Sequence, residues 1–317
     1  MYNRKRKIKK GPIIAVIIVI VIIILAVVSF KLYTHYTSNE YKLGELGYSE
    51  KEISTLLKSN DKVLDKALTK YDKDLIPLTK QKYFLWKNYN TYKEYITKQK
   101  KETNDIDYKE IVTMVNVNRN YEYYTHTKKT DMKKDNAILV NKYYSLPEKY
   151  APTDIVDVSN WYAFDGIKTR QVVLDAFKEM FNAAKEDGHT LIINSGYRTY
   201  DTQKKVYDEY KDLKGEEYAD EYAARPDYSE HQSGLALDII TYGASGETFD
   251  TTDAFKWLQK NAHKYGFILR YPKDKEDITG YAYESWHYRY LGKDLATKVK
   301  KSGLTYDEYY AYYLDKE

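Results

Sequence analysis

The chain has 317 residues, no cysteine and a formal net charge of +4 at pH 7. Without disulfides, any exported part must be held together by its own hydrophobic core. The charge is unevenly spread: residues 1–39 carry seven Lys or Arg and no acid, which leaves 44 basic and 47 acidic groups in the remainder. Because the remainder is nearly neutral, the composition argues against a nucleic-acid-binding protein, and we expect no nucleic-acid partner.

The N-terminus has the pattern of a membrane anchor. Residues 1–12 include six Lys or Arg and are expected to form a basic cytoplasmic tail. An apolar run of 18 residues follows over 13–30, and at about 1.5 Å per residue it spans roughly 27 Å, close to the hydrocarbon thickness of a bilayer. Basic flanks stay in the cytoplasm, so the chain after about residue 31 is expected outside the membrane.

A cleaved secretory signal is the alternative for this segment. The apolar region of a signal peptide normally has about 7–15 residues and ends at a cleavage site with small side chains. Here the run is longer and ends in Val27-Val28-Ser29-Phe30, where valine is bulky next to a cut. We therefore expect an uncleaved, single-pass transmembrane helix.

Residues 39–105 are polar, Lys-rich and helical in pattern. Ser49 and Glu52 have the spacing of a capping box. Apolar residues then repeat at helical spacing, at Ile53, Leu56, Leu57, Val63, Leu64, Ala67 and Leu68. We expect a helical spacer or a small accessory module here, and we expect the charged segment 98–107 to be a linker.

Beyond residue 107, short strands and helices are intermixed. The apolar runs predict strands over 137–141, 190–194, 267–271 and 286–290. Helices are predicted over 172–184, from a cap at Asp201 to Asp212, and from a cap at Asp253 to Gly266. Because regular βαβ spacing is missing, the pattern predicts a domain of the α+β class over residues 107–317.

A dense motif runs from Ser229 to Asp238, with the sequence SEHQSGLALD. On a strand over 234–239, Gly234 and Asp238 would share one face and the leucines the other. The leucine face suits a core, and the small residues opposite leave room for an ion and a substrate. A carboxylate inside an apolar strand needs a partner, and the nearby His231 suggests that the partner is a metal ion.

Glu284 and His287 follow some fifty residues later. With His231 and Asp238 they supply three metal ligands and a base, which suits a catalytic zinc with one open position. Residues three apart lie on opposite faces of a continuous strand. If both serve one site, Glu284 should therefore lie in the loop before the strand that carries His287.

These motifs together resemble the zinc D-alanyl-D-alanine carboxypeptidases of the VanY type, peptidase family M15, which include L,D-carboxypeptidase relatives. The resemblance covers about residues 107–295. It rests on S-x-H-x-x-G-x-A-x-D over 229–238 and on E-x-x-H over 284–287. Other similar segments are LVNK over 139–142, SGYRT over 195–199, GFILRYP over 266–272 and WHYRY over 286–290. One departure is Ser285, which stands where the family often has proline and is expected to loosen the loop that holds Glu284.

The resemblance implies a hedgehog/DD-peptidase-like zinc peptidase fold, with a small antiparallel sheet and flanking helices. It implies that His231, Asp238 and His287 bind one Zn²⁺ ion. It also implies that Glu284 is the general base for zinc-activated water.

A role for Arg198 follows from the resemblance and from chemistry. A guanidinium offers a planar fork of donors to the free carboxylate of a substrate, and it can also stabilise an oxyanion. Both roles stay open for Arg198. Ser195 and Gln203 are expected to contact the substrate. Most of the 37 tyrosines are interpreted as surface and core residues and not as a site, and Trp286 is interpreted as a wall of the cleft.

The sequence thus predicts an extracellular zinc carboxypeptidase of a Gram-positive bacterium, anchored in the cell membrane. Its substrates would be peptidoglycan stem peptides, from which it removes the C-terminal D-alanine with either D,D- or L,D-specificity. No obligate protein partner is expected. The alternatives are a peptidoglycan endopeptidase of the same family, for which Arg198 would be dispensable, and a non-catalytic cell-wall-binding or sensor protein.

Overall fold

The computed structural model describes residues 10–103 and 105–315. It divides the chain into two compact units, Met1–Phe84 and Leu85–Glu317. The boundary lies before the linker predicted at 98–107, so the last part of the predicted accessory module belongs to the second unit. Most of the predicted basic tail, and residue 104 of the predicted linker, lie outside the described residues.

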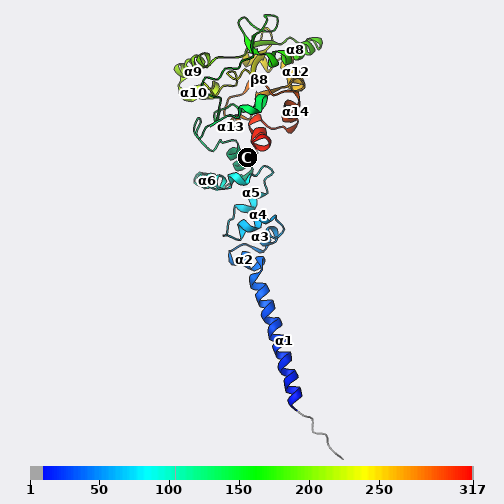
Figure 1. The fold of residues 1–317 in the computed structure, drawn as a ribbon. Helices are drawn as coiled ribbons and strands as arrows, with labels where there is room; N and C mark the ends of the chain where they lie inside the picture. Colours follow the sequence, from blue (N-terminus) through cyan, green and yellow to red (C-terminus); the bar gives the residue numbers. More distant parts are fainter. Residues whose placement is uncertain (1–9, 104, 316–317) are drawn as a thin grey trace, which may run out of the picture. The chain divides into compact units, whose positions relative to one another are not determined.

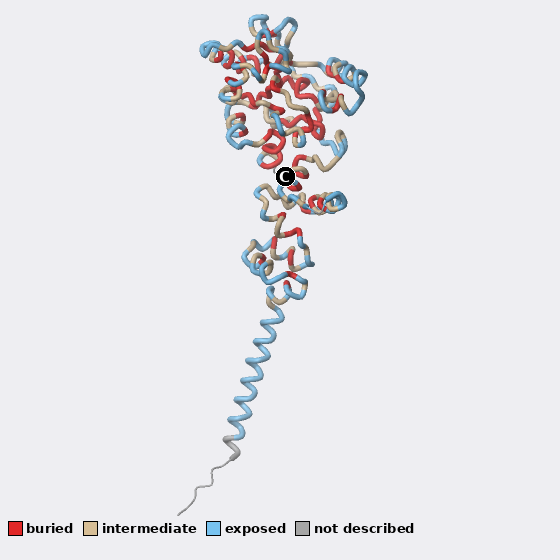
Figure 2. The backbone as a smooth tube through the Cα atoms, turned by 180° about the vertical axis from the view of Figure 1, so that it is seen from behind, coloured by how far each residue is buried: buried red, intermediate tan, exposed pale blue. Residues whose placement is uncertain are grey.

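The first unit begins with the long helix α1 (Lys10–Thr37), which is drawn in blue in Figure 1. Within its stretch from Ile14 to Thr37, an 18-residue window has a mean hydropathy of 3.2, and no residue of that window is buried. Figure 2 shows this stretch in the colour of exposed residues. Its length and composition suit a membrane span or a signal sequence alike.

Four short helices complete the first unit: α2 (Asn39–Glu45), α3 (Glu50–Leu56), α4 (Asp61–Ala67) and α5 (Leu75–Thr79). The predicted capping box of α3 is confirmed, because the Ser49 hydroxyl accepts from the Glu52 N–H and the Glu52 carboxylate accepts from the Ser49 N–H. Fully buried apolar side chains hold these helices together, at Leu43, Leu56, Ala67, Leu75 and Leu78.

The second unit is the larger one. Its helices are η1 (Trp86–Asn88), α6 (Tyr89–Gln99), α7 (Tyr108–Asn116), η2 (Met132–Ala137), α8 (Gln171–Glu186), α9 (Tyr200–Lys214), α10 (Glu216–Tyr222), α11 (Gly246–Phe249), α12 (Asp253–Asn261), η3 (Ala262–Tyr265), α13 (Glu276–Thr279), α14 (Lys293–Ser302), α15 (Tyr306–Tyr309) and η4 (Tyr310–Leu314). Two small strand pairs, β1 (Lys128–Lys129) with β2 (Tyr144–Ser145) and β3 (Ile155–Asp157) with β4 (Lys168–Arg170), lie outside the main sheet.

The main sheet has four antiparallel strands in the order β5-β6-β8-β7. They are β5 (Ile192–Ser195), β6 (Ala236–Ile240), β7 (Phe267–Tyr271) and β8 (Glu284–Tyr290). In the register of the sheet, Asp238 on β6 lies opposite Ser195 on β5 and opposite His287 on β8. The predicted α+β class and the implied small antiparallel sheet with flanking helices are confirmed.

Three of the four predicted strands occur, and one prediction is wrong. Residues 138–140 form no strand, although Ile138 and Val140 are buried in the main hydrophobic core. Asn141 makes only an isolated bridge to Tyr144. The apolar character of this run therefore reflects side-chain packing and not pairing in a sheet.

Two predicted helix caps and one strand start were also wrong. Thr199 caps α9 and Thr252 caps α12, each with its side-chain oxygen accepting a backbone N–H. Asp201 and Asp253 lie instead in the first turns, where acidic groups favour the helix dipole. Gly234 adopts φ +70° before β6, so the strand predicted from residue 234 begins only at Ala236.

One face of β6 and the helix α8 share the main core of the second unit. Leu235, Leu237 and Ile239 are fully buried, as the sequence predicted for the leucine face. Phe177 and Met180 of α8 are fully buried in the same cluster. This core supports the opposite side of β6, on which Asp238 lies.

Phe177→Ala should test how far this core stabilises the second unit. Removing a fully buried phenyl ring should cost about 3–5 kcal/mol, whereas Asn182→Ala on the exposed side of α8 should change stability by less than about 0.5 kcal/mol. Chemical denaturation followed by circular dichroism measures both variants. Equal stability of the two variants would contradict the assignment of α8 to the core.

Candidate active site

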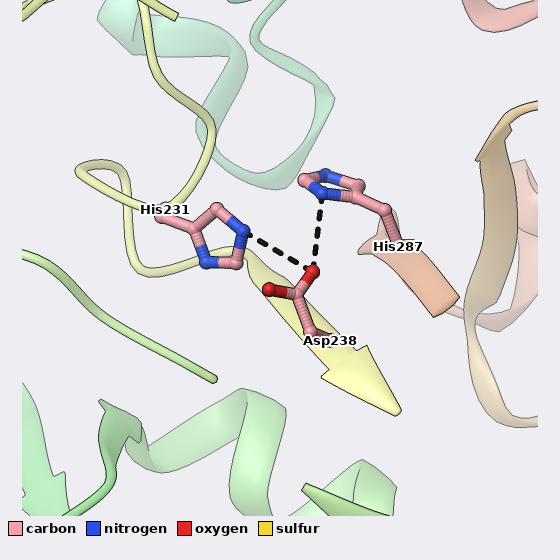
Figure 3. Close-up of side chains that lie close together, drawn as sticks. All are labelled: His231, Asp238 and His287. Carbon is pink, nitrogen blue, oxygen red and sulfur yellow. Dashed lines mark ion pairs between the residues drawn. The ribbon is translucent and has the colours of Figure 1, made fainter. Parts of the chain in front are cut away.

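Three side chains predicted to bind metal converge in the second unit. His231 comes from the loop before β6, Asp238 from β6 and His287 from β8, as Figure 3 shows. Nε2 of His231 lies 3.3 Å from Oδ1 of Asp238, and Nδ1 of His287 lies 3.4 Å from the same oxygen. One ligand atom from each residue lies within 4.8 Å of the others, and all three residues are buried.

The donor atoms of this cluster fit a metal ion. Among the described residues, no hydrogen-bond partner reaches the buried Oδ1 of Asp238. Nδ1 of His231 lies 2.7 Å from the Gly196 carbonyl, and Nε2 of His287 lies 3.3 Å from a carboxylate oxygen of Glu230. Each imidazole can therefore donate its N–H away from the cluster and turn a lone pair towards the space between the three residues, where a zinc ion would lie.

Glu284 lies beside this cluster, but not in the loop where we expected it. It is the first residue of β8 and pairs with Tyr271 of β7. The register shifts between this pair and the pair of Leu269 with Tyr288, so β8 carries extra residues there. The irregularity breaks the alternation of faces, and Oε2 of Glu284 lies 3.4 Å from Nδ1 of His287.

Burial and neighbouring charges set the protonation of these groups. Burial raises the pKa of the Glu284 carboxyl to about 7, and the nearby Asp238 acts in the same direction. Burial disfavours the charged form of His287, yet the carboxylates of Asp238 and Glu230 raise its pKa to about 9. Glu284 therefore has the pKa of a base that works near neutral pH, and the carboxylates beside His287 would balance the charge of a bound metal ion.

Arg198 lies on the other side of Asp238. Its Nη2 donates to Oδ2 of Asp238 at 3.2 Å and to Oγ of Ser195 at 2.9 Å. Its Nη1 donates to Oε1 of Gln203 at 3.3 Å, and Gln203 also accepts from Ser229. Ser195 and Gln203 thus hold the guanidinium in place. Their predicted contact with the substrate stays a prediction.

A cavity of about 610 Å³ opens over these residues. Trp286 lines it, as expected for a wall of the cleft, and so do Arg198, Gln203 and Glu284. Six of the 37 tyrosines line this cavity as well: Tyr210, Tyr218, Tyr222, Tyr271, Tyr281 and Tyr283. Only Tyr271 belonged to a motif noted in the sequence.

Ser285, the departure from the family pattern, is buried at the edge of the site. Its hydroxyl donates to the Gly246 carbonyl at 3.1 Å and so ties β8 to α11. A Cβ on Gly246 would come within 2.8 Å of the Trp286 ring, so this close approach requires glycine. Ser285 thus makes a side-chain hydrogen bond that proline cannot make, because proline has no donor in its side chain.

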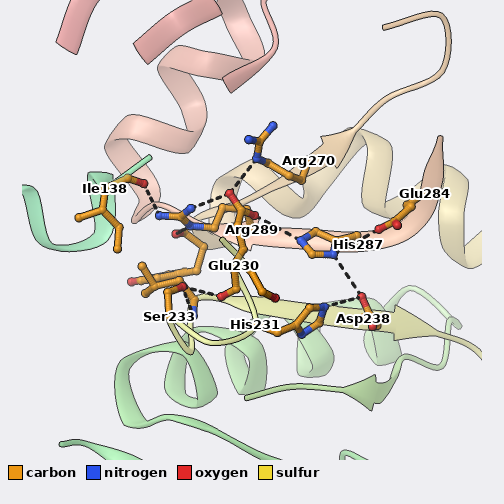
Figure 4. Close-up of polar contacts among 12 residues, drawn as sticks. Ile138, Glu230, His231, Ser233, Asp238, Arg270, Glu284, His287 and Arg289 are labelled. Carbon is orange, nitrogen blue, oxygen red and sulfur yellow. Dashed lines mark hydrogen bonds and ion pairs between the residues drawn. The ribbon is translucent and has the colours of Figure 1, made fainter. Parts of the chain in front are cut away.

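Glu230 is a site residue that the sequence reasoning missed. It is 2% exposed, and its Oε1 accepts from Arg270 at 2.8 Å and from Arg289 at 2.7 Å, as Figure 4 shows. Burial disfavours its charge, but the two guanidinium groups hold the pKa of Glu230 well below its usual range. Its position between Ser229 and His231 in the motif was the only signal.

Comparison with known proteins agrees with this geometry. The sequence model of the family described as "VanY: D-alanyl-D-alanine carboxypeptidase" matches residues 166–293, which include the candidate ligands and Glu284. The inferred carboxypeptidase YodJ of Bacillus subtilis (strain 168) is 45% identical over 202 residues, which cover 60% of this chain and 74% of YodJ. The D-alanyl-D-alanine carboxypeptidase of Enterococcus faecium is 38% identical over 186 residues, which cover 56% of this chain and 58% of that protein.

Solved structures give the same result. The structure of the LdcB LD-carboxypeptidase matches with a TM-score of 0.55 and 44% sequence identity. The match covers 59% of this chain and 91% of the LdcB chain. Sequence and fold therefore agree, and the chain belongs to the VanY family of D-alanyl-D-alanine carboxypeptidases.

Proposed function

We propose that this protein is a zinc carboxypeptidase that removes the C-terminal D-alanine from peptidoglycan stem peptides. The convergence of His231 Nε2, Asp238 Oδ1 and His287 Nδ1 beside Glu284 carries this proposal. The names of the relatives support the substrate class, since one is a D-alanyl-D-alanine carboxypeptidase and the LdcB structure is described as revealing the molecular basis of peptidoglycan recognition.

In the proposed mechanism of peptide hydrolysis, the metal ligands, Glu284 and Arg198 have separate roles. A zinc ion held by the two histidines and Asp238 would supply the Lewis acid that polarises the carbonyl and activates the attacking water. Glu284 accepts the proton of that water and delivers it to the leaving amine. Arg198, fixed by Ser195 and Gln203, presents a cation to the C-terminal carboxylate of the substrate or to the oxyanion.

The location of the enzyme is part of the proposal. Peptidoglycan lies outside the cytoplasmic membrane, and α1 is long and apolar enough to cross it. Six basic residues precede the apolar run and favour a cytoplasmic N-terminus. We infer that α1 anchors the protein and leaves the second unit facing the cell wall.

Defined stem peptides test the activity directly. The full-length protein in detergent should release one D-alanine from a pentapeptide, a tetrapeptide or both, and mass spectrometry of the products identifies the bond that is cut. A strong chelator should abolish release and added Zn²⁺ should restore it. Cleavage of cross-linked dimers without D-alanine release would instead indicate an endopeptidase.

Glu284→Gln should lower kcat about 100- to 10,000-fold, because the amide cannot accept the proton of the attacking water. The amide has nearly the shape of the carboxylate, so the variant should remain folded. Steady-state kinetics on the preferred stem peptide measure the loss. Glu186→Gln, an exposed position at the end of α8, is the matched control and should keep full activity. Wild-type activity in Glu284→Gln would overturn the role of Glu284.

Arg198→Ala should separate the two roles left open for the guanidinium. If Arg198 binds the carboxylate, the wild type should prefer a free C-terminus over its amide, and the variant should lose that preference. If Arg198 stabilises the oxyanion, kcat should fall about 100- to 1,000-fold on both peptides. Because Arg198 also contacts Asp238, zinc content is measured in parallel. Unchanged kinetics on both peptides would exclude both roles.

A further inference from the structure

A buried chain of charged side chains leads away from His287, on the side opposite the metal cluster. Nε2 of His287 lies 3.3 Å from Oε2 of Glu230. Oε1 of the same carboxylate accepts from Nε of Arg270 at 2.8 Å and from Nη1 of Arg289 at 2.7 Å. The side chains of Glu230, Arg270 and Arg289 have no exposed surface.

The two arginines are themselves fixed from other parts of the fold. Arg270 forms a two-pronged ion pair with Asp307 of α15, at 2.6 and 3.2 Å, and Asp307 also accepts from Asn141 at 2.8 Å. Arg289 donates to the backbone carbonyls of Asn136 and Ile138, at 3.0 and 2.7 Å. Thus α15 is linked to Glu230 through the guanidinium of Arg270, and the segment around residues 136–141 through that of Arg289. Figure 4 shows the second link, from Ile138 through Arg289 to Glu230.

Burying these charged side chains has a high desolvation cost, so their retention needs an explanation. Two arginines and two carboxylates are desolvated together, and apolar residues of the same volume often stabilise a fold equally well. Two guanidinium groups on one oxygen keep Glu230 anionic and leave its other oxygen for His287. An anionic acceptor on the outer nitrogen of a histidine orients the ring and makes the inner nitrogen a better metal ligand.

The other histidine of the cluster is held differently. Nδ1 of His231 faces the neutral carbonyl of Gly196 at 2.7 Å. Only one of the two candidate histidine ligands therefore has a charged acceptor behind it. The charged acceptor belongs to His287, which also contacts Glu284 at 3.4 Å.

We propose that Glu230, clamped by Arg270 and Arg289, is a positioning residue that fixes the ring of His287 with Nδ1 towards the metal. Asp307 of α15 contributes to the same positioning, because its ion pair holds the guanidinium of Arg270 in place. The proposal rests on the proposed function, since it takes His287 to be a metal ligand. It adds that the affinity for zinc depends on residues that touch neither the metal nor the substrate.

The zinc affinity of the metal-free protein tests this proposal without reference to activity. Glu230→Gln keeps the shape and an acceptor oxygen but removes the charge, and it should weaken zinc binding about 10- to 100-fold. Asp307→Asn, one step farther away, should weaken it by a smaller factor. Competition with a chromogenic chelator measures both. Glu179→Gln is the matched control, since it removes a carboxylate from an exposed ion pair with Lys293, and it should leave zinc affinity unchanged.

Two further measurements separate positioning from a purely structural role. The visible spectrum of the Co²⁺-loaded protein should differ between Glu230→Gln and the wild type, because the ring of His287 is no longer held in one orientation. Circular dichroism of each metal-free variant reports whether it is folded. Wild-type zinc affinity in a folded Glu230→Gln variant would overturn the proposal. Unfolding of both metal-free variants would also overturn it, because the network would then serve the fold alone. Absence of zinc binding in the wild type would instead contradict the proposed function, on which this proposal rests.

Discussion

The structure depends on one buried carboxylate in the middle of the main sheet. Asp238 lies on a central strand between a serine and a histidine of its neighbours, and it is 5% exposed. Burial disfavours its charge, but His231 and His287 hold its pKa well below the usual range. The carboxylate therefore stays ionised and needs positive partners on every side. The imidazoles of His231 and His287 and the guanidinium of Arg198 surround it, and a metal ion in the proposed site would supply a further positive charge.

A second layer of charge surrounds the first. Glu230 lies behind His287, Arg270 and Arg289 lie behind Glu230, and Asp307 lies behind Arg270. Positive and negative groups alternate outward from the cluster, so each of these two guanidinium groups lies against a carboxylate. The alternation links the cluster to α15, near the end of the chain, and to residues 136–141, which are far away in sequence. The candidate metal cluster is thus part of the buried interior of the second unit and does not lie on its surface.

The irregularity in β8 determines how the proposed base lies against the candidate ligand on the same strand. A regular strand would place Glu284 and His287 on opposite faces. The register shift against β7 brings both side chains to one side, within 3.4 Å. A Glu284 in a loop before β8 could also have approached His287, but the loop would have held its carboxylate less firmly. Because Glu284 pairs with β7 and the hydroxyl of Ser285 is hydrogen-bonded to the Gly246 carbonyl, the sheet holds the backbone that carries the Glu284 carboxylate.

Local sequence patterns were sufficient to propose the candidate site and to predict most of the elements. The spacing in SEHQSGLALD and ESWH identified the candidate ligands and the base, apolar periodicity gave α8 and three strands, and an unbroken apolar run gave α1. These features are determined within a few residues, so the sequence by itself contains them. The run at 138–140, the register shift in β8, the clamp on Glu230 and the tyrosines of the cleft were decided only by the tertiary structure. Each depends on which distant segment packs against it, and neither periodicity nor motif spacing contains that information.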